Sequence, residues 1–137
     1  METIVLISCV SKKLSYKTKA KEIYISPLFK MSLKFGKSFN PDKIFILSAK
    51  YGLIDLNREI NPYDKTLNEM NSSEKRLWAD NVLHDLRKVA NLDMDEFIFL
   101  AGENYRKYLT PHIKNYKIPL KGLSIGKQLQ YLKKEVK

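Results

Sequence analysis

The sequence is poor in the residues that form disulfides and metal sites, with one cysteine and two histidines among its 137 residues. The single cysteine, Cys9, excludes an internal disulfide and a cysteine-rich metal site. His84 and His112 fall on different predicted helices, which argues against a histidine-based metal site. We therefore expect neither a bound metal nor a cofactor.

Long apolar runs are also missing. The longest, such as residues 4–7 and 97–101, are too short to cross a bilayer. No basic region precedes a long apolar stretch near the first residue, so we expect no secretory signal. These absences favour a cytoplasmic protein that does not interact with membranes.

The composition is that of a globular domain, with 44% apolar and 11% aromatic residues. Its net charge of +10 is concentrated in two segments, residues 11–22 with +4 and residues 114–137 with +6. Clustered lysines favour a polyanion such as DNA or RNA, or a phosphorylated ligand. The alternative is a lysine coat that only keeps the protein soluble.

Predicted strands alternate with predicted helices along the chain. We expect strands over residues 3–10, 43–49, 96–101 and 116–120, a lysine-rich loop over residues 11–21, and helices over residues 26–39, 72–90 and 102–115 and from residue 127. The β-branched apolar run of the first strand predicts that it is buried. Ser26-Pro27 marks one helix start, because Ser can cap a helix and Pro is tolerated at its first position, and Asn71 to Glu74 resembles a capping box at another. This alternation predicts a single three-layer α/β domain over residues 1–137, with a mainly parallel sheet of about four strands flanked by helices. Right-handed crossovers bring the carboxyl ends of the strands to one edge, where open α/β sheets bind ligands.

The loop after the first strand carries Ser8, Cys9, Ser11 and Lys12. Small hydroxyls, free backbone N–H groups and lysines suit a phosphate or a carboxylate. The loop lacks the glycines of a Walker loop, which disfavours nucleoside triphosphate hydrolysis. Cys9 could act as a nucleophile, but no histidine is predicted beside it, and a buried thiol is the alternative.

A long polar loop is predicted from Ser48 to Asp64, after the second strand. Lys50 could hold an anion, and Tyr51 or Tyr63 could stack on a base. Gly52 indicates a positive backbone angle or close approach of a ligand. Asp64 could orient a water molecule, and a carboxylate that caps a turn is its alternative role.

Two further loops at the predicted sheet edge precede helices. Gly102, Glu103 and Tyr105 follow the third strand, and Gly126 and Gln128 open the last helix. Backbone N–H groups at the last helix start could bind an anion. The dipole of a helix start also favours the Glu103 carboxylate without any ligand.

These motifs resemble the signature of the YaaA family. The resemblance is carried by Ile7-Ser8-Cys9 with Ser11-Lys12, Tyr24 to Phe29, Ser48 to Leu53, Pro62 to Leu67, Gly102 to Tyr105, and Gly122 to Leu129. It covers nearly the whole chain in order, and is closest to a group of small bacterial and phage relatives of YaaA. YaaA itself is associated with DNA binding and protection from peroxide, but this chain has no room for the extra DNA-binding elements of YaaA. The wider resemblance includes a domain of archaeosine synthase and uracil-DNA glycosylase-like folds, which implies a domain that handles a base or nucleoside.

The leading hypothesis is an enzyme acting on a nucleobase or nucleoside, within DNA or RNA, by cleavage of an N-glycosidic bond. Its expected catalytic residues are Asp64, Lys50 and Tyr51. Its expected substrate-binding residues are Ser8, Cys9, Ser11, Lys12, Ser48, Gly52, Tyr63, Gly102, Glu103, Tyr105, Gly126 and Gln128. The alternatives are a non-enzymatic DNA- or RNA-binding protein and a binder of free nucleosides or nucleotides. The sequence leaves the oligomeric state open.

Overall fold

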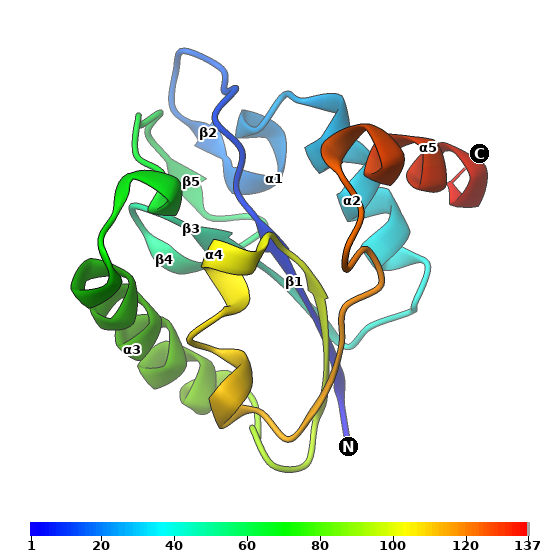
Figure 1. The fold of residues 1–137 in the computed structure, drawn as a ribbon. Helices are drawn as coiled ribbons and strands as arrows, with labels where there is room; N and C mark the ends of the chain where they lie inside the picture. Colours follow the sequence, from blue (N-terminus) through cyan, green and yellow to red (C-terminus); the bar gives the residue numbers. More distant parts are fainter. Residues whose placement is uncertain (137) are drawn as a thin grey trace.

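The computed structural model describes residues 1–136 and contains a central five-stranded sheet with the order β4-β3-β1-β6-β7 (Figure 1). Its strands are β1 (Thr3–Ser8), β3 (Lys43–Ser48), β4 (Gly52–Asp55), β6 (Glu96–Leu100) and β7 (Asn115–Lys117), and β2 (Thr18–Lys19) pairs separately with β5 (Glu59–Ile60). The helices are α1 (Ala20–Ile23), α2 (Pro27–Lys37), α3 (Ser72–Val89), α4 (Glu103–Arg106) and α5 (Ile125–Glu135), with short 3-10 helices η1 (Leu67–Glu69) and η2 (Thr110–His112).

Strand β1 lies at the centre of the sheet because its side chains can be buried on both faces. It runs parallel to β3 and β6, and its register pairs Ile7 with Ile46 and Leu6 with Phe99. All four of these side chains are at most 1% exposed. A continuous β-branched and aliphatic run is typical of such a doubly covered parallel strand. The predicted α/β fold is therefore confirmed.

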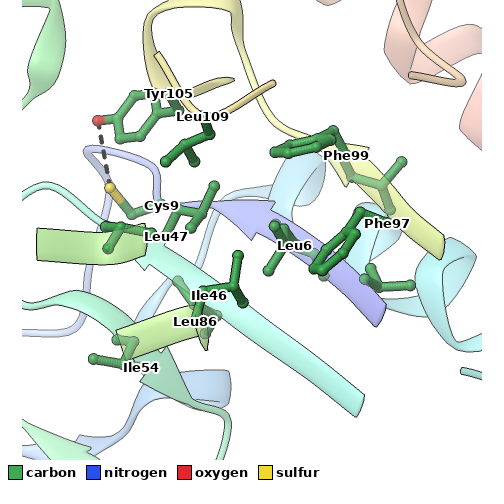
Figure 2. Packing of buried hydrophobic residues seen from close by; sticks show 14 of the residues in the cluster. Leu6, Cys9, Ile46, Leu47, Ile54, Leu86, Phe97, Phe99, Tyr105 and Leu109 are labelled. Carbon is green, nitrogen blue, oxygen red and sulfur yellow. Dashed lines mark hydrogen bonds between the residues drawn. The ribbon is translucent and has the colours of Figure 1, made fainter. Parts of the chain in front are cut away.

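Helices α2 and α5 cover one face of the sheet and α3 covers the other (Figure 1). Helix α2 begins as predicted, with the Ser26 side chain accepting a hydrogen bond from the Phe29 N–H. The predicted capping box of α3 is also present, with reciprocal bonds between Asn71 and Glu74. Leu6, Ile46 and Phe97 of the sheet belong to one buried cluster that also includes Leu86 of α3 (Figure 2).

The structure corrects the expectation of one long loop over residues 48–64. This segment contains β4, which pairs antiparallel with β3, and β5, which pairs with β2. The turn into β4 has Gly52 at a φ of 72°, a backbone angle that glycine adopts without strain. The backbone conformation therefore accounts for glycine at this position. Ile54 and Ile60 are almost fully buried, so the two strands contribute to the core. The lysine-rich segment 11–21, also expected to be a loop, includes β2 and the start of α1.

The predicted helix over residues 102–115 is divided into α4 and η2. Pro111 lies within η2 and has no N–H group with which to continue an α-helix. The fourth predicted strand, residues 116–120, is β7 at residues 115–117. Across residues 1–136, no helix combines the length and the apolar character that a membrane span requires.

Candidate functional site

A cavity of about 850 Å³ lies at the carboxyl edge of β1, β6 and β7. Its walls come from five parts of the chain: residues 7–12, 26–32, 65–68, 99–106 and 118–129. Three of these segments, residues 7–12, 99–106 and 118–129, follow the neighbouring strands β1, β6 and β7. The cavity is therefore at the edge where the parallel topology predicts a ligand.

The cavity is lined by both apolar and charged residues. Apolar side chains from three elements and the connection after β7 contribute to the lining, namely Leu28, Phe29, Phe99, Leu120, Leu123 and Leu129. Four basic side chains also line it, Lys12, Lys65, Arg106 and Lys121, against a single carboxylate, Glu103. Apolar surface with a few convergent polar groups is the usual character of a small-molecule site.

The structure brings together the predicted residues of the first and third strand ends. The predicted residues that line the cavity are Ser8, Cys9, Ser11, Lys12, Gly102, Glu103, Tyr105 and Gln128. The predicted residues of the second strand end do not line it, and neither does Gly126: this group is Ser48, Lys50, Tyr51, Gly52, Tyr63, Asp64 and Gly126. Strand β3 lies on the far side of β1 from β6, and its loop turns directly into β4.

Cys9 is 8% exposed and lies against Tyr105 (Figure 2), and both residues line the cavity. Its thiol donates to the Tyr105 hydroxyl at 3.4 Å, and that hydroxyl also accepts from the Leu67 N–H at 3.4 Å. Burial, together with the nearby Cys9, raises the pKa of Tyr105 to about 12, so its hydroxyl stays neutral. Neither histidine lines the cavity. The Cys9 thiol is therefore hydrogen-bonded to a tyrosine, as expected of a buried thiol, and no histidine of the cavity lining could activate it as a base.

Ser48 is fully buried and anchors the segment after β3. Its hydroxyl accepts from the N–H groups of Lys50 and Tyr51 at 3.3 and 3.0 Å, and donates to the Tyr63 hydroxyl at 2.8 Å. The Tyr63 hydroxyl lies 2.6 Å from that of Tyr24. Burial is the main cause that raises the pKa of both tyrosines, so both hydroxyls stay protonated. Ser48 and Tyr63 thus have a structural explanation that needs no ligand.

Some lining residues were missed from the sequence. Lys65 and Thr66 line the cavity, as do Ser26, Asn104 and Lys121. Lys65 and Thr66 lie inside the Pro62–Leu67 motif, which was the available signal. Ser26 was assigned only to capping, and Lys121 only to a basic segment. No pattern in the sequence indicates that these residues line the same cavity.

Within residues 1–136, no group of three or more His, Cys, Asp and Glu side chains is arranged to hold a metal ion.

The model of a family of unknown function, DUF6884, matches residues 4–134. The chain is also similar to the uncharacterized protein YfjM of Bacillus subtilis strain 168, with 26% identity over 147 aligned positions. That alignment covers 99% of this chain and 96% of YfjM. No solved structure matches the chain.

Proposed function

The chain belongs to DUF6884, a family of unknown function, and we propose that it binds a nucleoside unit of DNA or RNA and hydrolyses its N-glycosidic bond. One observation carries the proposal. The cavity at the carboxyl edge of the sheet combines apolar lining residues with four basic residues and one acidic residue. The resemblance to YaaA and to uracil-DNA glycosylase-like folds supports the same substrate class.

The size and charge of the cavity suit a nucleoside with its phosphate. A volume of about 850 Å³ lies within the range of about 300–1,000 Å³ typical of ligand pockets. Apolar lining residues such as Leu28 and Leu123 would contact the face of a base. Lys12, Lys65 and Lys121 would neutralise phosphate oxygens, because ammonium groups bind phosphate as point charges. A base held this way must be outside its stack.

Glu103 is the carboxylate that this reaction requires. It lies at the first turn of α4 and is the single acidic residue of the cavity lining. We propose that it accepts a proton from water as the water oxygen adds to the sugar C1′ and the base departs with the bonding electron pair. The departing base is then protonated by solvent. Asp64, which the sequence favoured for this role, does not line the cavity.

The test is base release from plain and modified oligonucleotides, followed by mass spectrometry. Wild-type protein should release free base. Glu103→Gln should slow release about 100-fold or more, because a positioned general base contributes about 10²–10⁴-fold. The same variant should keep its affinity for the substrate, since the amide preserves the shape of the side chain. Asp64→Asn is the matched control and should retain wild-type activity.

Binding without catalysis is the second candidate, and the basic side chains of the cavity favour it. A non-enzymatic nucleic-acid-binding protein or a nucleotide-binding protein would need the four cations but not the carboxylate. Under that function no base is released, and Glu103→Gln binds oligonucleotides at least as tightly as the wild type. Base release by the wild type, lost in Glu103→Gln, would exclude it.

A further inference from the structure

Three basic side chains lie over two tyrosine rings close to the cavity. The Lys13 Nζ is 4.3 Å from the centre of the Tyr63 ring. The Lys50 Nζ and the Arg58 Cζ are 5.3 and 5.2 Å from the centre of the Tyr51 ring. The two rings contact each other edge to face, with their centres 5.6 Å apart. We call these five residues the cation–tyrosine cluster.

Hydrogen bonds of their hydroxyl groups hold the two tyrosine rings of the cluster in place. The Tyr63 hydroxyl bonds to Ser48 at 2.8 Å and lies 2.6 Å from the hydroxyl of Tyr24. The Tyr51 hydroxyl donates to the Asn61 carbonyl at 3.5 Å. Each ring therefore offers a fixed face on which a cation is attracted. Since cations already lie over both rings, the cluster is better suited to binding an anion than to stacking a base.

The cations of the cluster are not neutralised by ion pairs. No salt bridge among residues 1–136 includes Lys13, Lys50 or Arg58. Asp64 is the acidic neighbour of Lys13: burial lowers the pKa of Lys13, and Cys9 and Asp64 partly offset that effect. Lys50 and Arg58 are exposed. Three cations gathered over two adjacent rings, none of them in an ion pair within residues 1–136, create a local positive charge that attracts phosphate.

Two chain segments connect the cluster to the cavity. Lys13 directly follows Lys12, and Tyr63 lies two residues before Lys65; both Lys12 and Lys65 line the cavity. Lys13 also donates to the carbonyl of Ser11, another lining residue, at 3.0 Å. A ligand in the cavity that continued beyond its mouth on this side would therefore meet the cluster.

We propose that the cation–tyrosine cluster binds the backbone phosphates of a single nucleic-acid strand whose neighbouring nucleoside occupies the cavity. This inference rests on the proposed function and specifies its substrate as a strand in preference to a free nucleoside. The strand is single because a base in the cavity must be unpaired and unstacked. Backbone phosphates held by a basic groove are the usual electrostatic part of single-strand binding.

The test compares two triple variants with equal losses of charge. The cluster variant carries Lys13→Gln, Lys50→Gln and Arg58→Gln. The control variant carries Lys34→Gln, Lys37→Gln and Arg87→Gln, three residues in the last turns of α2 and α3. Affinity for a short single-stranded oligonucleotide is measured by fluorescence anisotropy over a salt series, after circular dichroism confirms that both variants fold. Binding of a nucleoside monophosphate is measured in parallel.

The cluster variant should bind the oligonucleotide more weakly at low salt. The slope of log K against log salt should become about 2 less steep, because each phosphate contact on a single strand contributes about 0.7. The control variant should keep the wild-type slope, and both variants should bind the nucleoside monophosphate as the wild type does.

Four results would decide between the inference and the function on which it rests. An unchanged slope in the cluster variant, with normal monophosphate binding, overturns the inference and leaves the proposed function standing. Cluster-dependent binding of oligonucleotides without any nucleoside or monophosphate binding supports the cluster and overturns the cavity function. Tighter binding of duplex than of single strand overturns the assignment to a single strand. Failure of the wild type to bind any oligonucleotide at low salt overturns the inference.

Discussion

Buried hydroxyl groups are the most distinctive feature of this protein at the scale of single residues. Tyr24 and Tyr105 are buried and Tyr63 is half-buried, and each hydroxyl has a protein partner. Ser48 connects this network to the backbone after β3. Within residues 1–136, no buried side-chain nitrogen or oxygen is without a hydrogen-bond partner. A satisfied polar network of this kind fixes one arrangement of the core.

Alkaline titration should reveal one of these tyrosines. The fold stabilises the neutral hydroxyl of Tyr105, whose pKa rises to about 12 from an ordinary value of about 10. Its contribution to stability is therefore complete below pH of about 10 and is lost as the pH rises towards 12. Urea unfolding measured from pH 8 to pH 12 should show Tyr105→Phe losing stability less steeply than the wild type over the upper part of this range.

The matched control for this titration is Tyr16→Phe. Tyr16 is 60% exposed, so its removal should leave the pH dependence of the wild type unchanged. The slopes are compared, because loss of the Tyr105 hydroxyl also leaves the Leu67 N–H without that partner and lowers stability at every pH. Parallel slopes for Tyr105→Phe and the wild type would contradict the prediction.

At the scale of elements, the close packing of α2 on β1 limits which residues the helix can carry. Gly36 lies in the last turns of α2, directly over the centre of the sheet. A Cβ atom at this position would lie 2.9 Å from Val5 Cγ1 and 3.4 Å from Leu100 Cδ1. Val5 is β-branched and fully buried on the central strand, so it cannot turn aside. Close packing on Val5 therefore explains the glycine at position 36, although glycine has a low helix propensity.

Gly36→Ala should destabilise the protein. The gain in helix propensity of about 1 kcal/mol opposes overpacking of about 1–3 kcal/mol, and we expect a net loss of up to about 2 kcal/mol in the free energy of unfolding. Gly126→Ala in α5 is the control, because its Cβ would meet nothing within 4 Å. The control should stabilise the protein by up to about 1 kcal/mol. Urea unfolding measures both.

Combining Gly36→Ala with Val5→Ala separates the clash from other effects. The smaller side chain removes the 2.9 Å contact, so the double variant should lose less stability than the sum of the two single variants. If the two stability losses were strictly additive, or if Gly36→Ala stabilised the protein, α2 and β1 would be shown to accommodate the extra methyl group without strain.

At the scale of the whole molecule, the sheet order separates the cavity from the cation–tyrosine cluster. Strand β1 lies between β6, whose end opens on the cavity, and β3, whose end leads to the cation–tyrosine cluster. The loop after β1 contributes Lys12 to the cavity and Lys13 to the cluster. A single central strand therefore brings the cavity and the cluster to adjacent positions, which is the arrangement that the proposed nucleic-acid strand would require.

Filling the cavity should remove ligand-induced stabilisation. A ligand at 100 times its Kd should stabilise the wild type by about 2.7 kcal/mol, which raises the Tm by several degrees. Gly102 lines the cavity and has open space where a side chain would be placed, so Gly102→Leu should block the ligand without a clash. Differential scanning fluorimetry with nucleosides, monophosphates and short oligonucleotides measures the shift.

Gly126→Leu is the control for the filled cavity. Its position also has open space but does not line the cavity, so its Tm should rise with ligand as in the wild type. Equal shifts in Gly102→Leu and the wild type would place the ligand elsewhere.

The sequence by itself determined the elements that local chemistry controls. The β-branched run of β1 indicated a strand buried on both faces, and Ser26-Pro27 and the Asn71 capping box marked the starts of α2 and α3. Alternation of strands and helices then predicted the parallel sheet, which the structure confirms. These signals are local, because propensity, capping and periodicity act over a few residues.

Only the tertiary structure decided which loops meet. The sequence treated the ends of β1, β3 and β6 as one site, whereas the strand order joins Ser8 and Glu103 in the cavity and leaves Asp64 outside its lining. The hairpin between β3 and β4 was missed because its strand is four residues long and its burial comes from Ile54 packing in the core. Strand order, hairpin pairing and side-chain convergence depend on contacts between residues far apart in the chain, and no short sequence pattern records them.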